Sequence, residues 1–208
     1  MSNFKLIKKD IDISIFNTEL NKYLENNRWG GTRAERVSVQ RNTKNIMLRN
    51  NFLKNPEAYS TKEELTIALA NSENNVLEKY NYKHFQKTYK YLEDFADEKK
   101  SQLSTVMIVS LDAKEKVYPH IDFGDYYKKR DRYHIPIKTK GSINICDGEV
   151  QEYKEGEMWW FNNKKTHEAY NDSHEERIHI IFDILPKRRS LIKKTVDFLY
   201  KKIALNIN

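Results

Sequence analysis

The chain has 208 residues, enough for a single folded domain over residues 1–208, and its 12% aromatic content excludes a disordered chain despite only 38% hydrophobic residues. The net charge of +7 comes from lysines spread along the whole chain, which is more typical of a biased composition than of a binding patch, so a nucleic-acid partner is not expected. One cysteine, Cys146, excludes a disulfide framework, and no stretch reaches the roughly 18 apolar residues of a membrane span, so we expect a cytoplasmic protein without a membrane partner.

Residues 1–103 have the pattern of a mainly helical scaffold with two short strands. The apolar residues between positions 15 and 24 recur on one face of a helix. Alternation in VSVQR (37–41) and NIMLR (45–49) predicts two short strands. Ser60 is a suitable N-cap for a helix that runs to about residue 71, and helical spacing continues to about residue 95.

From residue 104 to residue 186 the pattern changes to short runs rich in β-branched and aromatic residues. Turn residues separate these runs, which predicts an antiparallel sandwich or barrel that a jelly roll could close. The last segment, residues 187–208, is amphipathic with many basic residues and predicts a C-terminal helix packed on the barrel. The runs are STVMIVSL, KVYPHID, RYHIPIK, GSINIC, MWWF, THEAYN and RIHIIFDIL.

The late strands contain residues that suit a metal site. In a strand, residues i and i+2 project from the same face, so His120 and Asp122 can present their ligand atoms to one point. An antiparallel hairpin centred near Asp172 would place His167 opposite Arg177 on one face. Two histidines and one carboxylate form the facial triad of non-haem Fe(II) oxygenases, and an arginine beside them can clamp a carboxylate.

The order and spacing of these residues resemble the aspartyl/asparaginyl β-hydroxylase family, including its proline-hydroxylase-like members. The resemblance covers residues 119–183 and extends back to about Val37. The mammalian β-hydroxylase type has Gly at the position of Asp122, so this chain looks closer to bacterial members with a full triad. The matching motifs are His-x-Asp at 120–122, Arg-x-His-x-Pro at 132–136, Glu-Gly-Glu-x-Trp-Trp-Phe-Asn-Asn at 155–163, His167, Asn171 and Arg177.

The resemblance implies a double-stranded β-helix core over residues 104–186 that uses Fe(II) and 2-oxoglutarate, with ascorbate as a possible support. It implies His120 and His167 as iron ligands and Arg177 as the 2-oxoglutarate anchor. With the carboxylate of Asp122, the two histidines form the expected metal-binding and catalytic set of His120, Asp122 and His167. Arg132 and His134 match further co-substrate contacts. The expected reaction is hydroxylation of an unactivated C–H bond in an amino acid, an amino-acid derivative or a peptide side chain, with release of succinate and CO₂.

Two other classes of protein remain open from the sequence. One is a cupin-like metal-binding barrel that acts as an isomerase or binds a ligand without catalysis, and Arg177 argues against it because such a barrel needs no 2-oxoglutarate clamp. The other is a nucleic-acid-binding module that uses the basic C-terminal helix, which predicts strongly salt-dependent affinity.

Overall fold

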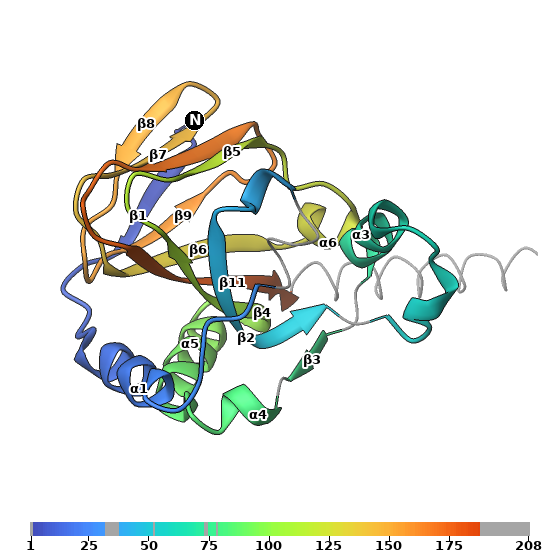
Figure 1. Ribbon diagram of the computed structural model, residues 1–208, viewed down its shortest axis with the longest axis horizontal. Coiled ribbons are helices and arrows are strands. Elements are labelled where there is room, and N and C mark those ends of the chain that lie inside the picture. The colour runs from blue at the N-terminus through green and yellow to red at the C-terminus, as the bar shows by residue number, and fades with distance from the viewer. Residues whose placement is uncertain (1, 32–37, 52, 73–74, 78, 188–208) are drawn as a thin grey trace, which may run out of the picture.

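The protein is built on two antiparallel β-sheets that face each other, as the computed structural model of residues 2–31, 38–51, 53–72, 75–77 and 79–187 shows (Figure 1). The larger sheet has the strand order β1-β9-β6-β11-β4-β2-β3, and the smaller has the order β5-β10-β7-β8. Two facing sheets of this kind form a double-stranded β-helix, the fold class that the sequence predicts. The strands are β1 (Phe4–Lys8), β2 (Thr43–Asn51), β3 (Asn75–Leu77), β4 (Ser101–Leu111), β5 (Lys116–His120), β6 (Asp131–Lys138), β7 (Ser142–Cys146), β8 (Glu149–Glu152), β9 (Met158–Phe161), β10 (His167–Asn171) and β11 (Arg177–Pro186).

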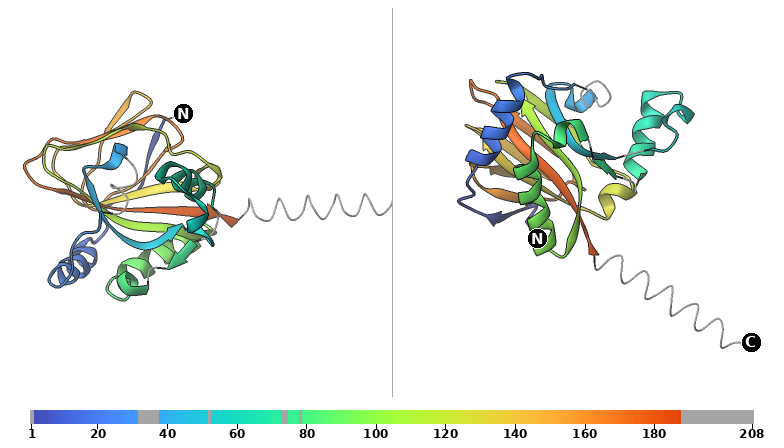
Figure 2. Two further views of the ribbon diagram at one scale, coloured as in Figure 1. Left: turned by 45° about the vertical axis from the view of Figure 1, so that its right-hand side comes forward. Right: turned by 90° about the horizontal axis from the view of Figure 1, so that it is seen from below.

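Helices cover the outer face of the larger sheet. In both views of Figure 2, α1 and α5 lie against this face, on the side away from the smaller sheet. Phe16 and Leu20 of α1, with Leu92 and Phe95 of α5, are buried there in the main hydrophobic core. No helix among the described residues is long and apolar enough to cross a membrane. The helices are α1 (Ser14–Leu24), α3 (Lys62–Asn71), α4 (Lys79–Tyr82), α5 (Gln86–Glu98) and α6 (Asp125–Lys128), with 3₁₀ turns η1 (Ser38–Gln40) and η2 (Pro56–Ala58).

The alternation of side chains along β11 separates the core from the barrel interior. Ile178, Ile180, Phe182 and Ile184 belong to the core shared with the helices. Residues between them point to the opposite face, because successive side chains of a strand alternate. Arg177, His179, Ile181 and Asp183 are therefore directed into the barrel, and all four are buried. The strand thus supports the hydrophobic core with one face and supplies polar groups to the barrel interior with the other.

Several predictions for residues 1–103 need correction. The expected strand over VSVQR is a 3₁₀ turn at Ser38–Gln40, since three alternating residues cannot distinguish a strand from a turn. The N-cap of α3 is Thr61 instead of Ser60. This part of the chain is also more than a scaffold, because β1, β2 and β3 all join the larger sheet. Residues 188–208 of the predicted C-terminal helix lie outside the described residues.

Candidate active site

His120, Asp122 and His167 come together at one end of the smaller sheet. Their ligand atoms all lie within 4.8 Å of one another. β10 pairs with β5 in the register that places His167 beside His120, and the two imidazole centroids are 4.2 Å apart. The two histidines therefore come from neighbouring strands. The constellation that the sequence predicts is present.

Backbone carbonyls fix the orientation of both imidazoles. Nδ1 of His120 lies 2.8 Å from the carbonyl of Tyr118, and Nδ1 of His167 lies 2.9 Å from the carbonyl of Lys165. A carbonyl only accepts, so each Nδ1 carries a proton, and in a neutral ring Nε2 is then the nitrogen with the free lone pair. Burial lowers the pKa of His167 to about 4, which keeps this imidazole neutral at pH 7. Neutral imidazoles with fixed rings suit metal ligation.

Asp122 lies two residues beyond the end of β5. Its side chain is therefore not directed by the alternation of a strand, contrary to the prediction for His120 and Asp122. Its backbone N–H donates to the carbonyl of Asn163 (3.1 Å), and its Oδ2 accepts from Nδ2 of Asn163 (2.9 Å). Nη1 of Arg132 donates to the same oxygen (2.7 Å). The partners in these bonds, Asn163 and Arg132, lie far from Asp122 in the sequence. They fix the position of the carboxylate, which the loop alone would leave free to move.

Arg132 links this carboxylate to the larger sheet. Its Nε and Nη2 donate to the two carboxylate oxygens of Asp183 on β11, at 2.8 and 2.9 Å. Burial acts to lower the pKa of Arg132, but the carboxylates of Asp122 and Asp183 outweigh it and raise that pKa above its usual value. Arg132 is thus a permanently charged bridge between Asp122 and the barrel wall.

The hairpin that was expected to pair His167 with Arg177 does not exist. β10 pairs with β5 and β7 in the smaller sheet, whereas β11 pairs with β4 and β6 in the larger one. The connecting segment crosses from one sheet to the other, and Asn171 fixes its start. Nδ2 of Asn171 donates to the carbonyls of Leu111, Asp112 and Glu175, at 3.1, 3.0 and 2.8 Å. His167 and Arg177 face each other across the barrel instead of along one sheet.

Arg177 nevertheless lines the same inner cavity as His120 and His167, a space of about 70 Å³. Its guanidinium is buried, and Nη1 donates to Oγ of Ser142 at 3.4 Å. His134 also lines this cavity, and burial together with the positive charges of Arg177 and Arg132 holds its pKa well below the usual value. The cavity therefore combines two ligand histidines with a neutral imidazole and a buried cation.

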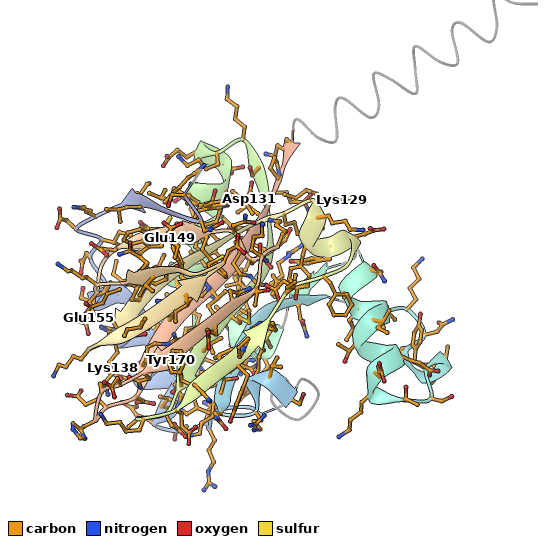
Figure 3. All side chains as sticks on the ribbon, turned by 90° about the horizontal axis from the view of Figure 1, so that it is seen from above. Lys129, Asp131, Lys138, Glu149, Glu155 and Tyr170 are labelled. Atoms are coloured by element: carbon orange, nitrogen blue, oxygen red, sulfur yellow. The ribbon has the colours of Figure 1, made fainter. Side chains whose placement is uncertain are left out.

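A second, larger space of about 580 Å³ opens on the other side of the ligands. His120 and Asp122 line it together with α3, η1 and the loop that joins β5 to α6. Figure 3 shows α3 at the margin of the barrel. Exposed apolar side chains rim this groove: Ile67 is 43% exposed, Ile121 49% and Phe123 52%. The three candidate ligands thus lie between a small inner cavity and a larger groove with an apolar rim.

Gly124 allows the groove to take this form. Its φ of +95° lies in a region that favours glycine, and a Cβ there would lie 2.4 Å from the carbonyl oxygen of Ala70. The loop that carries Asp122 and Phe123 can therefore press directly on the end of α3. The backbone N–H of Asp125 donates to the side chain of Asn71 across this contact (3.1 Å).

Sequence reasoning missed several residues that shape the site. Asp183 had a signal, since an acidic residue inside an otherwise apolar strand demands a partner. Gln40, whose Nε2 lies 3.4 Å from Nε2 of His120, was assigned to a strand. Asn144 and Tyr153 line the inner cavity, but nothing in their local sequence indicates it.

Comparison with known proteins agrees with this geometry. A family model described as Aspartyl/Asparaginyl beta-hydroxylase matches residues 19–186. None of the curated proteins compared by sequence matches the chain. The fold is similar to that of an oxidoreductase of the 2OG-Fe(II) oxygenase family from Burkholderia pseudomallei, with 9% identity, a TM-score of 0.58, and coverage of 88% of this chain and 84% of that chain.

A viral collagen prolyl hydroxylase from Paramecium bursaria Chlorella virus-1, solved with 2-oxoglutarate, has 12% identity, a TM-score of 0.49, and coverage of 88% of this chain and 96% of that chain. At 9% identity, the likeness to the Burkholderia protein concerns the fold alone. The family model, by contrast, spans the chain from α1 to the end of β11. The chain therefore belongs to the aspartyl/asparaginyl β-hydroxylase family and is a hydroxylase-type oxygenase.

Proposed function

We propose that the protein is an Fe(II)- and 2-oxoglutarate-dependent dioxygenase that hydroxylates an unactivated C–H bond of an amino acid, an amino-acid derivative or a peptide side chain. The observation that carries the proposal is the candidate ligand set of His120, Asp122 and His167 between a small inner cavity with a buried arginine and a larger groove. The donor set suits Fe(II), since two imidazoles and one carboxylate leave positions open for a co-substrate and dioxygen.

The residues divide the work between the two sides of the site. Arg177 would bind the distal carboxylate of 2-oxoglutarate in the inner cavity. Arg132 and His134 would make further contacts with the co-substrate. Arg132 also holds Asp122 in place. When bound, Fe(II) with 2-oxoglutarate and dioxygen would supply the oxidation that converts C–H into C–OH, with release of succinate and CO₂.

The groove is the proposed site of the primary substrate, because it reaches the same ligands from outside the barrel. Its volume of about 580 Å³ lies in the range of small-molecule sites. Ile67, Ile121 and Phe123 would contact an apolar part of the substrate. Both an amino-acid-like small molecule and a peptide segment fit this description, and a cytoplasmic location remains part of the proposal.

The test is succinate formation by purified Fe(II)-loaded protein given 2-oxoglutarate, ascorbate and air, across a panel of free amino acids and short peptides. We expect succinate to rise with one class of substrate and to disappear in His167→Ala. Arg177→Ala should raise the 2-oxoglutarate concentration needed for half-maximal rate far more than it disturbs the fold. Asp122→Gly asks whether the carboxylate is an essential ligand.

A failure would favour the cupin-like alternative. No succinate with any candidate, together with no anaerobic binding of 2-oxoglutarate by calorimetry, would indicate a metal-binding barrel of another function. The buried Arg177 speaks against that alternative, because a buried cation is costly unless an anion pairs with it.

A further inference from the structure

Three buried side chains around the inner cavity have polar atoms that bond to nothing in the described part of the chain. They are Nδ2 of Asn144, the hydroxyl of Tyr153 and Nε of Arg177. All three residues line the cavity, and their exposed fractions are 7%, 2% and 3%. Native proteins leave few buried polar groups unpaired, because the group loses water without gaining a partner. Three such groups around one cavity point to a ligand.

The chemistry of the three atoms indicates what the ligand is. Each of them can donate a hydrogen bond, so together they need an acceptor. Arg177 adds a positive charge that forms no ion pair with any described residue. Burial lowers the pKa of Arg177 to about 10, which still leaves the guanidinium charged at pH 7. An anionic oxygen acceptor fits all of these groups.

Tyr153 is fixed before any ligand arrives. Its ring stacks on Trp159, with centroids 5.1 Å apart and an interplanar angle of 10°, and packs against His179 at 5.9 Å. His134 and Phe4 meet the ring edge-on, each at 6.0 Å. Arg177 is close enough to act electrostatically on the hydroxyl: burial raises the pKa of Tyr153, and the guanidinium partly offsets this. A rigid donor beside a cation is suited to hold a carboxylate, since little freedom is lost on binding.

We propose that Tyr153 and Asn144 are co-substrate-binding residues that complete a carboxylate clamp with Arg177. The inference rests on the proposed function. It adds two binding residues that the spacing of the motifs did not indicate. A carboxylate has about four acceptor positions, enough for all three donors. The clamp binds the distal carboxylate of 2-oxoglutarate. It therefore favours 2-oxoglutarate over 2-oxo acids that lack this carboxylate.

The experiment compares two ligands on one variant. Anaerobic calorimetry on the Fe(II)-loaded protein measures the Kd of 2-oxoglutarate and of 2-oxopentanoate, which has the same chain length but no distal carboxylate. Tyr153→Phe removes one hydroxyl, and we expect the Kd of 2-oxoglutarate to rise about 10- to 100-fold, as for a hydrogen bond to a charged group. The Kd of 2-oxopentanoate should stay unchanged.

A matched control is Tyr133→Phe. Tyr133 is also a buried tyrosine, but it lies on β6 of the larger sheet and stacks on Phe182 on the face toward the helices. Its substitution should leave both Kd values unchanged. Asn144→Ser provides a second variant should Tyr153→Phe fail to fold, and it should weaken 2-oxoglutarate alone.

The outcomes separate the two proposals. If the wild type binds 2-oxoglutarate and both Tyr153→Phe and Asn144→Ser bind it equally well, the clamp is wrong and the proposed function stands. If a variant weakens both ligands to the same extent, its side chain only shapes the cavity and the clamp is again wrong. If the wild type binds no 2-oxoglutarate, the proposed function itself fails.

Discussion

Arg132 holds the candidate iron ligand Asp122 to the rest of the protein. Its guanidinium forms ion pairs with both Asp122 and Asp183. The side chains of all three residues are at most 5% exposed. Two carboxylates around one guanidinium leave the group with a net negative charge, which a divalent metal at Asp122 would balance. The same arginine therefore serves both the fold and the site.

Removal of one carboxylate tests this arrangement. Asp183→Asn keeps the shape of the side chain but leaves Arg132 with one charged partner, so we expect the free energy of unfolding to fall by about 3 kcal/mol. Urea denaturation of the metal-free protein measures the change. Asp172→Asn is the control, because its pair with Lys114 is exposed and should contribute less than about 1 kcal/mol. Equal losses in the two variants would contradict a structural role for the buried network.

At the level of residues, the sequence could indicate the ligands but not what supports them. His120, Asp122 and His167 stand in a recognisable order and spacing. Tyr153 and Asn144 reach the cavity only through the pairing of distant strands, which no local pattern encodes. The roles assigned to His120, Asp122, His167, Arg132, His134 and Arg177 stay predictions until the variants are measured.

Among the elements, strands from residue 101 onward were the most predictable, because all of them except β8 are short apolar runs between turn residues. β8 was missed since its sequence, EVQE, has a single apolar residue, Val150, which is too little to show an alternation. β1, with the sequence FKLIK, was also missed. Only Phe4 of this strand is fully buried, so the strand has no clear alternation of buried and exposed positions. Sheet membership was harder still: β10 and β11 are neighbours in sequence but belong to different sheets, and only the bonds of Asn171 across the corner reveal why.

The start of α3 offers a prediction at this scale. The Thr61 side chain accepts from the N–H of Glu64 (3.1 Å), and the Glu64 carboxylate accepts from the N–H of Thr61 (3.2 Å). Thr61→Ala should cost the helix about 1 kcal/mol and speed amide hydrogen exchange within α3 about fivefold. Ser60→Ala is the control, since Ser60 contributes only its backbone N–H to Glu64. Faster exchange in Ser60→Ala than in Thr61→Ala would reassign the cap.

At the scale of the whole molecule, a bound metal would link the smaller sheet to the larger one. His120 and His167 belong to the smaller sheet, whereas Asp122 is tied through Arg132 to the larger one. A ligand that binds only the folded state stabilises it by about 2.7 kcal/mol at a concentration 100 times its Kd. We therefore expect Mn(II), as a redox-stable probe, to raise the melting temperature and EDTA to reverse the rise.

The same melting experiment on two histidine variants identifies the site. His167→Ala should lose the metal-dependent rise, because it removes one of the three candidate ligands. His174→Ala should keep it, since His174 is an exposed residue in the turn between β10 and β11. A rise of the same size in His167→Ala would place the metal elsewhere.

The pairing of β1 with β9 has a consequence for synthesis of the chain. Phe4 lies opposite Phe161, which comes 157 positions later in the chain. At roughly 5–20 residues per second, the first strand would wait on the order of 8–30 s on the ribosome before its neighbour is made. Phe4 is also part of the wall of the inner cavity, which Arg177 completes later still. The inner cavity thus forms only after β9 and the start of β11 have been made, and a nascent chain that lacks them would leave β1 without its partner strand.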